Sequence, residues 1–257
     1  MKIIKLVLLS FLLIPFSLAQ EYKTSFDSNS ASNRLNIMIE GGAIEVQGYS
    51  GNELIITADG YEAPPEKAKG LLPLYANNKE DNSGIGLSVS KNGNEIQITS
   101  VGHQDVNYII KVPNQSFLKM NAGPQNDALR IENMKGEIEV KAHSDDVVME
   151  GINGPVVANS ISGNMKLTFD EITTDKPIMV SVVSGDIDLI MPSTTKADFK
   201  LSSISGEVYT DFDMAMKQKE QEGERYGMRK PINGSINGGG SPIHISTVSG
   251  NIYLRKE

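Results

Sequence analysis

The sequence lacks cysteine and tryptophan altogether, and only 7 of its 257 residues are phenylalanine. A chain without cysteine forms no disulfide and offers no thiolate for catalysis or for metal binding. Few large aromatic side chains are present to fill a wide core, whereas thin coils stacked along an axis need only Ile, Val, Leu and Met. The composition therefore favours a solenoid over a sandwich, with a stability that comes from packing alone.

The sequence is also short of basic residues. It has 24 Lys and Arg residues against 32 Asp and Glu residues, which gives a formal net charge of −8 at pH 7. An acidic chain repels the phosphate backbone, so we expect no nucleic-acid partner. The charged residues are dispersed along the chain, which indicates a soluble β protein rather than an acidic recognition surface.

The first 19 residues have the pattern of a secretory signal peptide. Lys2 and Lys5 precede an apolar run over residues 6–18, and small residues at positions 17 and 19 suit a signal peptidase. The run is too short for a transmembrane anchor and is broken by Pro15. We therefore predict export, to the periplasm or to the cell surface, with no transmembrane segment after the signal peptide is removed.

We expect cleavage between Ala19 and Gln20. The mature chain then has about 238 residues and, because Lys2 and Lys5 are lost, a formal net charge of −10. No cysteine follows the apolar run, so attachment of a lipid at that point is excluded.

A short motif, Ser-Gly followed by Asn, Asp or Glu, recurs through the second half of the chain. Positions −7, −5, −2, +2 and +4 from each glycine are mostly apolar, as around Gly185 in the set Ile178, Val180, Val183, Ile187 and Leu189. The apolar residues recur every second position on each side of the glycine, and this alternation shifts by one residue at the glycine. Two strands that meet at a bend produce such a shift. We expect these apolar positions to point into the core. The motif occurs at Ser162-Gly163-Asn164, Ser184-Gly185-Asp186, Ser205-Gly206-Glu207 and Ser249-Gly250-Asn251.

Between Leu129 and Leu167 the bends fall nine residues apart, and Ser-Gly corners alternate with a second kind of corner. A coil of about 18 to 22 residues with two strands and two corners explains this spacing best, and a three-sided coil of about 27 residues is the alternative. Glycine is expected at the corners because a sharp reversal usually needs a positive φ, which Asp and Asn also tolerate. The sequence thus predicts an all-β chain folded as a β-helix-like β-solenoid. Its expected corners are Gly42, Gly136, Asp145, Gly154, Gly163, Gly185, Gly206 and Gly250.

We divide the chain into three parts: the signal peptide at 1–19, an N-terminal β region and cap at 20–128, and regular solenoid repeats at 129–257 with an insertion at 213–241. The irregular segment 61–82 is our candidate for covering one end of the stack. Within the insertion, 233–241 is expected to be a flexible return, and a solvated loop explains the insertion more simply than a binding loop. Further strands are expected at 54–57, 85–89, 95–99 and 106–112.

No residue cluster in the sequence indicates catalysis, a cofactor or a metal. The corner serines recur in coil after coil without a unique partner base, so capping of corner amides explains them better than nucleophilic chemistry. His103, His143 and His244 are far apart in the sequence. His143 stands out because other coils have Ile or Val at its position, and we expect it to bond to the backbone rather than to a metal.

Paired carboxylates are the remaining candidates for chemistry, because Glu137 and Glu139 share a strand face, as do Asp186 and Asp188. Hydrolysis of a polysaccharide needs two carboxylates in different environments across a groove. The residue after the corner glycine varies among Asp, Glu and Asn, which is typical of an outward turn position. We therefore predict no enzyme activity, and weak calcium binding at the outward carboxylates stays an open alternative.

Taken together, the motifs resemble those of a known family. Gly136-Glu-Ile-Glu-Val140, Ser184-Gly-Asp-Ile-Asp-Leu189 and Ser249-Gly-Asn-Ile-Tyr-Leu254 are similar to repeats of the bacterial putative-adhesin domain family of exported β-solenoid proteins. The likeness covers about residues 35–254 and is strongest after Leu129. Repetitive turn motifs identify a fold better than an activity, and the resemblance supplies no catalytic residues.

The resemblance implies an exported, non-enzymatic scaffold that presents a surface to an envelope protein, to a glycan or to a neighbouring cell. Two alternatives remain. One is a polysaccharide-active β-helix enzyme, which requires a groove with two carboxylates. The other is a structural envelope protein that self-associates through terminal strands, for which we place Tyr253 in the pairing strand.

Overall fold

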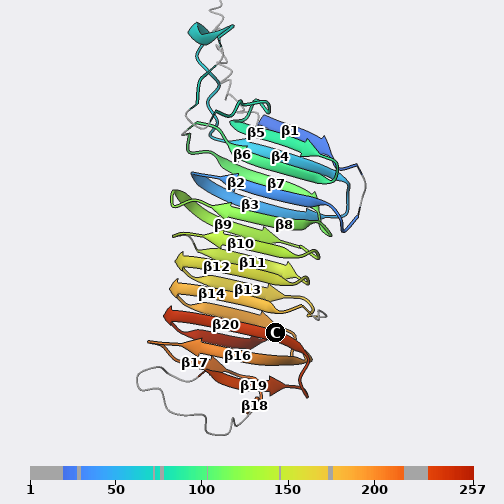
Figure 1. Ribbon diagram of the computed structural model, residues 1–257, viewed down its shortest axis with the longest axis vertical. Coiled ribbons are helices and arrows are strands. Elements are labelled where there is room, and N and C mark those ends of the chain that lie inside the picture. The colour runs from blue at the N-terminus through green and yellow to red at the C-terminus, as the bar shows by residue number, and fades with distance from the viewer. Residues whose placement is uncertain are drawn as a thin grey trace, which may run out of the picture.

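The structure is a computed structural model that describes residues 20–27, 30–71, 73–75, 78–102, 104–144, 146–172, 176–216 and 231–257. Within these residues the chain forms 21 strands and one short 3-10 helix, Glu66–Ala68. The strands make two long sheets, one of 10 and one of 11 strands, that face each other along the whole stack (Figure 1). The predicted all-β solenoid is therefore confirmed, and the three-sided coil is wrong because each coil contributes one strand to each of two sheets.

We call the two sheets A and B and give their strands in spatial order. Sheet A contains β1 (Gln20–Ser25), β4 (Glu53–Asp59), β7 (Asn107–Pro113), β3 (Gly42–Tyr49), β9 (Asn126–Glu132), β11 (Val147–Ile152), β13 (Met165–Phe169), β15 (Ile187–Met191), β21 (Ile252–Lys256) and β17 (Val208–Thr210). Sheet B contains β18 (Ala215–Met216), β19 (Ile232–Ile236), β16 (Ala197–Ser203), β20 (Ser241–Ser249), β14 (Ile178–Ser184), β12 (Val156–Ser162), β10 (Ile138–Ala142), β8 (Phe117–Ala122), β2 (Arg34–Ile39), β6 (Glu95–Ser100) and β5 (Leu87–Asn92).

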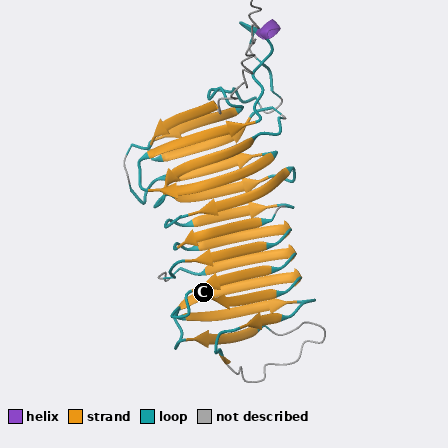
Figure 2. Cartoon of the chain, turned by 180° about the vertical axis from the view of Figure 1, so that it is seen from behind, coloured by secondary structure: helices purple, strands orange, loops and turns teal. Residues whose placement is uncertain are grey.

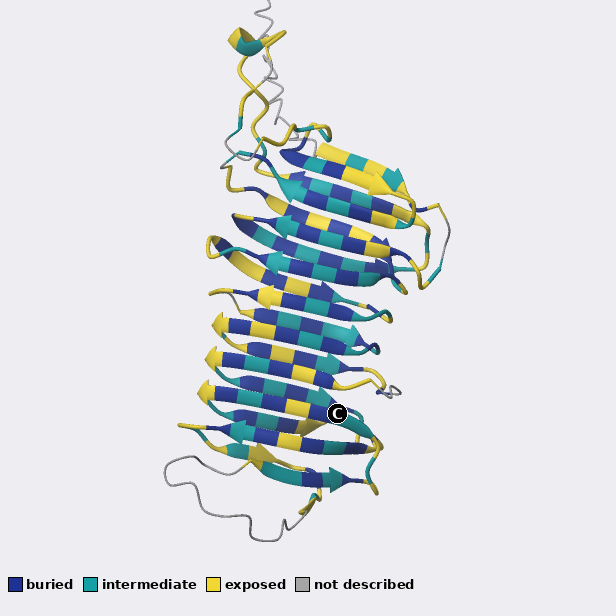
Figure 3. Ribbon diagram, in the orientation of Figure 1, coloured by how far each residue is buried: buried dark blue, intermediate teal, exposed yellow. Residues whose placement is uncertain are grey.

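The core is the thin layer between the sheets. From β8 to β15 successive strands alternate between the sheets, and each pairs in parallel with the strand of the next coil, as Val140 does with Ala158. Buried and more exposed residues alternate along these strands (Figure 3), as expected when one face of a strand is covered. The inward residues are almost all aliphatic, for example Ile138, Val147 and Leu167.

The coils at both ends of the stack are out of chain order. The last coil, β20 and β21, lies between β14–β15 and β16–β17, and the first coil, β2 and β3, lies between β6–β7 and β8–β9. The 44-residue interval from Gly206 to Gly250 is therefore a long return that inserts the last coil into the stack. Tyr253 pairs with residues on both sides, Asp188 and Tyr209, so its predicted place in a terminal pairing strand is wrong.

Antiparallel strands close the ends. At one end β1 and β4 extend sheet A and β5 extends sheet B, and at the other end β19 and β18 extend sheet B. The helical turn of the 61–82 segment projects beyond the stack (Figure 2). Tyr61, at the base of the segment, packs against the core, and antiparallel strands extend both sheets at the same end. The predicted flexible return at 233–241 is wrong, because most of it belongs to β19 and its turn into β20.

The corner glycines are needed mainly because adjacent coils approach closely. A Cβ on Gly136, Gly154 or Gly206 would lie 2.1, 2.0 and 1.9 Å from a backbone oxygen of the neighbouring coil. None of these three has the positive φ that we expected at every corner, whereas Gly42, Gly163, Gly185 and Gly250 do. Asp145 lies outside the described residues.

A ladder of side chains runs along the Ser-Gly corners. Asp146 Oδ1 accepts a hydrogen bond from the Asn164 amide at 2.7 Å, and Asn164 Oδ1 accepts one from the Asp186 amide at 2.9 Å. The ladder continues from Asp186 Oδ1 to the Asn251 amide at 2.7 Å and from Asn251 Oδ1 to the Glu207 amide at 3.0 Å. The acidic or amide residue after each corner glycine thus ties one coil to the next.

One part of the predicted inward pattern is wrong at the Ser-Gly corners. Position −2 is buried at Met134 and Ile152, but Ile161, Val183, Val248 and Ile204 are exposed. Before Ile152 a register shift and the positive φ of Gly151 form a bulge. The bulge shifts the alternation of inward and outward side chains by one residue, so that Ile152 points inward. At the Ser-Gly corners the strand continues without such a bulge, so position −3 points inward and position −2 points to solvent.

We expect Gly185→Ala to destabilise the fold by about 3 kcal/mol or more, because its Cβ would meet the Gly163 oxygen at 2.0 Å and its φ is 151°. Gly238→Ala is the matched control, since Gly238 has a φ of 87° but nothing within 4 Å of its Cβ position. It should cost only about 1 kcal/mol. Equal losses in urea unfolding would show that φ, rather than the coil contact, requires glycine.

The ladder predicts that Asp186→Asn is close to neutral, because the amide keeps the Oδ1 acceptor for Asn251. Asp186→Ala should cost about 1 kcal/mol, since it leaves that amide without its partner. Thermal unfolding of the two variants with and without calcium tests this. A large loss in Asp186→Asn, or a loss seen only with calcium present, would mean that the corner is a metal site.

Candidate binding surface on sheet B

A hollow lies on the outer face of sheet B, over β6, β2, β8 and β10. A pocket of about 650 Å³ adjoins a second one of about 380 Å³, and the two share Met38 and Asn121. We call the two together the sheet B groove. Its size is that of pockets that hold small molecules or short oligomers.

The floor of the groove consists of outward residues in register. Asn36 pairs with Gln97 on one side and with Lys119 on the other, and Met38 pairs in the same way with Thr99 and Asn121. Inward neighbours such as Ile37 are fully buried. The strand period of two therefore aligns amide, hydroxyl and amine groups in rows across four strands.

One wall of the groove is formed by Tyr75, from the segment that projects beyond the stack. Its ring lies against Gly102, where a Cβ would come within 2.9 Å of Tyr75 Cε1. A larger residue at 102 would push the ring away. Gln104 fixes the other side of the segment, because its side chain exchanges two hydrogen bonds with the Glu62 backbone at 2.9 Å.

The base of the same segment is tied by Asp81. Its carboxylate accepts hydrogen bonds from the Tyr61 hydroxyl at 3.0 Å, from the Ser83 amide and hydroxyl, and from the amides of Gly84 and Gly86. Burial alone would raise the pKa of Asp81, but these hydrogen bonds together outweigh it and hold the pKa below its ordinary value. Burial, and then the bond to Asp81, raises the pKa of Tyr61 to about 12.

A carboxylate, Glu40, and an imidazole, His143, also line the larger pocket. The Glu40 stem lies beside Gly123, and its backbone amide donates to Ser100 Oγ at 3.1 Å. His143 Nδ1 lies 3.2 Å from the Ala122 carbonyl oxygen, to which it donates. The prediction that His143 bonds to the backbone is confirmed.

The smaller pocket carries charges that are compensated. The Arg34 guanidinium lies 4.3 Å from the centre of the Phe117 ring, and Lys119 Nζ donates to both oxygens of Glu139 at 3.0 Å. Asn36 donates to Glu95. The groove therefore offers planar aromatic and amide surfaces together with hydrogen-bonding groups whose net charge is small.

The carboxylates that the sequence singled out do not form a catalytic pair. Glu137 pairs with Lys176 at 2.6 Å, Asp186 belongs to the corner ladder, and Asp188 accepts from Arg255 at 2.9 Å. Among the described residues no group of three or more His, Asp and Glu side chains could hold a metal ion.

The three histidines are not brought together either. His244 lines a separate shallow pocket with Met179 and Lys200, and β14 and β12 separate its strand from β10, which ends next to His143. His103 lies outside the described residues. Sequence reasoning identified His143 but missed Tyr75 and Gly102, because neither belongs to a repeat.

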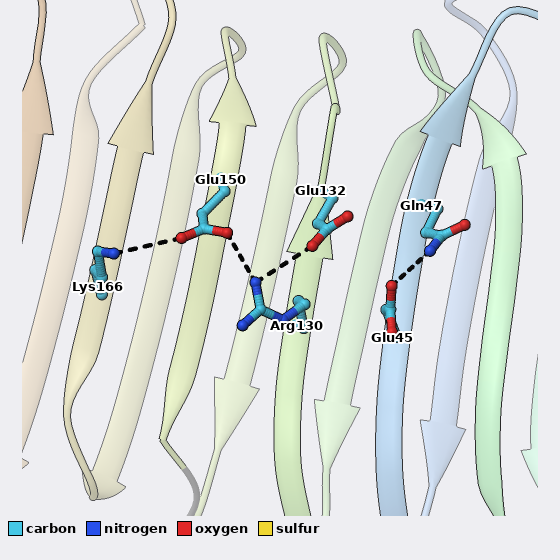
Figure 4. A network of polar contacts seen from close by, with 6 residues as sticks. All are labelled: Glu45, Gln47, Arg130, Glu132, Glu150 and Lys166. Carbon is cyan, nitrogen blue, oxygen red and sulfur yellow. Dashed lines mark hydrogen bonds and ion pairs between the residues drawn. The ribbon is translucent and has the colours of Figure 1, made fainter.

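The outer face of sheet A carries linked ion pairs as well. Arg130 donates to Glu132 at 3.2 Å and to Glu150 at 2.7 Å, and Lys166 lies 3.3 Å from the other oxygen of Glu150 (Figure 4). Such compensated charges remain well hydrated and contribute little to stability. We place the candidate site on sheet B, because the two adjoining pockets lie there.

One comparison with known proteins matches nearly the whole chain. A family model described as Toastrack DUF4097 matches residues 19–255, and a search of the curated proteins found no match. A solved structure of a putative cell adhesion protein from Clostridium sporogenes is similar at 10% identity and a TM-score of 0.42, over 93% of this chain and 100% of that one. Another, of a putative adhesin from Bacteroides fragilis, is similar at 10% identity and a TM-score of 0.43, over 95% and 99%.

No helix in the part of the chain that the structure describes is long and apolar enough to cross a membrane.

The bonds to Asp81 predict a pH dependence. Because its pKa is lower in the folded chain than its ordinary value of about 3.8, the ionised carboxylate stabilises the fold above that pH, and this contribution is lost as the pH falls through the folded-state pKa. Asp81→Asn should lower the melting temperature at pH 7, and the difference from the parent chain should shrink towards pH 2. A difference that stays constant with pH would contradict the role of the charge.

Proposed function

Because the chain belongs to the Toastrack DUF4097 family and presents a structured groove on one outer face, we propose that it is an exported, non-enzymatic scaffold that recognises an envelope glycan. The observation that carries the proposal is the sheet B groove. In it Tyr75 and Phe117 provide ring surfaces, while Asn36, Gln97 and Asn121 provide amides in rows.

The composition of the groove suits a sugar chain. Sugars present apolar ring faces, which pack on aromatic side chains, and hydroxyl groups, which pair with amides that both donate and accept. Parallel strands repeat at about 4.8 Å, so a chain of sugar units meets one outward side chain at each step across the sheet, as in the row Gln97, Asn36 and Lys119. An envelope protein with exposed amides is the other partner class that this chemistry admits.

A polysaccharide-active enzyme is the alternative, and the groove supports it less. In the described part of the larger pocket Glu40 is the only carboxylate in the lining. In the smaller pocket the carboxylates of Glu95 and Glu139 are bonded to Asn36 and Lys119. Glycoside hydrolysis by the usual route needs two carboxylates facing each other across the bond to be cleaved.

Export is part of the same proposal. It is supported by the basic, apolar and small-residue pattern of residues 1–19. A periplasmic or cell-surface location would bring the groove into contact with envelope polymers.

We expect a photoreactive amino acid placed at Asn121, on the floor of the groove, to crosslink to a glycan in intact cells. Placed at Ile109, an exposed residue of sheet A, it should not. Mass spectrometry of the adducts identifies the partner. Identical adducts from both positions, or no adduct from Asn121 together with release of reducing sugar ends by the purified chain, would contradict the proposal.

Once the glycan is identified, Tyr75→Ala should weaken its binding about tenfold or more, because an aromatic anchor is lost. His244→Ala, in the separate pocket of sheet B, is the matched control and should bind as the parent does. Isothermal titration of both variants measures this. Equal affinities would show that the ring of Tyr75 is not part of the site.

A further inference from the structure

A row of four exposed aliphatic side chains runs along the Ser-Gly edge of sheet B. The row, which we call the aliphatic stripe, consists of Ile161, Val183, Val248 and Ile204, with exposed fractions of 56, 49, 44 and 53%. The yellow arrowheads of β12, β14 and β20 on the left of Figure 3 mark its place. Single exposed aliphatic residues are common, but four in one row form a patch that needs an explanation.

The register places the four side chains next to one another. The pairings of β12 with β14, of β14 with β20 and of β16 with β20 align Ile161 with Val183, Val183 with Val248 and Val248 with Ile204. Neighbouring strands are about 4.8 Å apart, so the stripe is a ladder with that spacing. Its order in space, Ile-Val-Val-Ile, reads the same in both directions. Along the chain Ile204 comes before Val248, because the last coil is inserted into the stack.

The stripe is flanked by uncharged residues on both sides. The outward row before it on the strands is Asn159, Ser181, Ser246 and Ser202, and the row after it is Ser162, Ser184, Ser249 and Ser205. Ser246 Oγ donates to Ser181 Oγ at 3.1 Å. This contrasts with the ion pairs of sheet A and with the net charge of −8 for the whole chain.

We propose that the aliphatic stripe is the contact through which two copies of this chain associate about a twofold axis. The axis passes between the rungs of Val183 and Val248, so that Ile161 faces Ile204 of the second copy and Val183 faces Val248. A second copy has the same ladder spacing by construction, and the palindromic order lets each rung meet a rung of the same kind. The uncharged flanks let two acidic chains approach here without placing like charges opposite each other.

The contact is narrow, because only one aliphatic row and its two polar flanks take part. Interfaces well below about 1,200 Å² in total are typical of weak and transient complexes. We therefore expect a dimer that forms at high protein concentration, such as arises where an exported protein is crowded on a surface. The inference does not rest on the proposed function, since the sheet B groove lies over other strands.

Sedimentation velocity over a range of concentrations tests the association. Val183→Asp places a carboxylate in the stripe at an exposed position, and should weaken dimerisation at least tenfold while the melting temperature changes little. Ile109→Asp is the matched control, since Ile109 is an aliphatic residue of sheet A that is 40% exposed. It should dimerise as the parent does. A parent chain that stays monomeric up to millimolar concentration, or equal weakening by both substitutions, would overturn the proposal.

The absence of native cysteine permits a test of the geometry. With a short bis-maleimide, a mixture of Ile161→Cys and Ile204→Cys chains should crosslink readily, because these residues face each other across the axis. Ile161→Cys alone should crosslink poorly, because the two copies of residue 161 are three rungs apart, about 14 Å along the stripe. Faster crosslinking of Ile161→Cys alone would overturn the twofold arrangement.

Discussion

The close approach of one coil to the next at the corners is the constraint on which the structure depends. In the Ser-Gly corners a Cβ on one glycine would clash with the backbone oxygen of the corner glycine in the neighbouring coil. For Gly185 and Gly250 the distance from that Cβ to the oxygen would be 2.0 Å. Glycine at these positions lets the strands keep their normal separation up to the bend. The same spacing then permits the ladder of Asp186 and Asn251, in which a side chain of one coil accepts from the backbone of the next.

Insertion of both terminal coils into the stack follows from the same repetition. Because the coils share one spacing and one corner geometry, the last coil fits between β14–β15 and β16–β17 as well as beyond them. Its strands are then paired on both sides, which protects a chain end from fraying without a disulfide. The edges left over have short strands or ion pairs, such as Lys23 with Glu21 on β1, and both features discourage edge-to-edge pairing.

The sequence was sufficient to predict the coil, its two sides and the family, because each depends on residues within about 20 positions of one another. It was insufficient to predict the order in which the coils stack. Because the coils are nearly identical, several stacking orders satisfy the local sequence pattern equally well. The exposed position of Val183 was missed because the bulge that turns position −2 inward at Ile152 is absent from the Ser-Gly corners, although the apolar pattern is the same at both kinds of corner. The groove was missed because Tyr75 and Gly102 meet only through the path of a non-repeating segment.

The two outer faces divide the surface chemistry between them. On sheet A, Arg130 and Glu150 lie within a network of compensated charges. Removing these charged groups from water costs more free energy than a contact with a partner would supply. On sheet B, the charges of the groove are paired within it, as Lys119 is with Glu139, whereas the aliphatic stripe and its flanks are uncharged. A second copy of the chain therefore loses least hydration by approaching the stripe, and a sugar chain can lie on the rings and amides of the groove, where strands follow one another at about 4.8 Å.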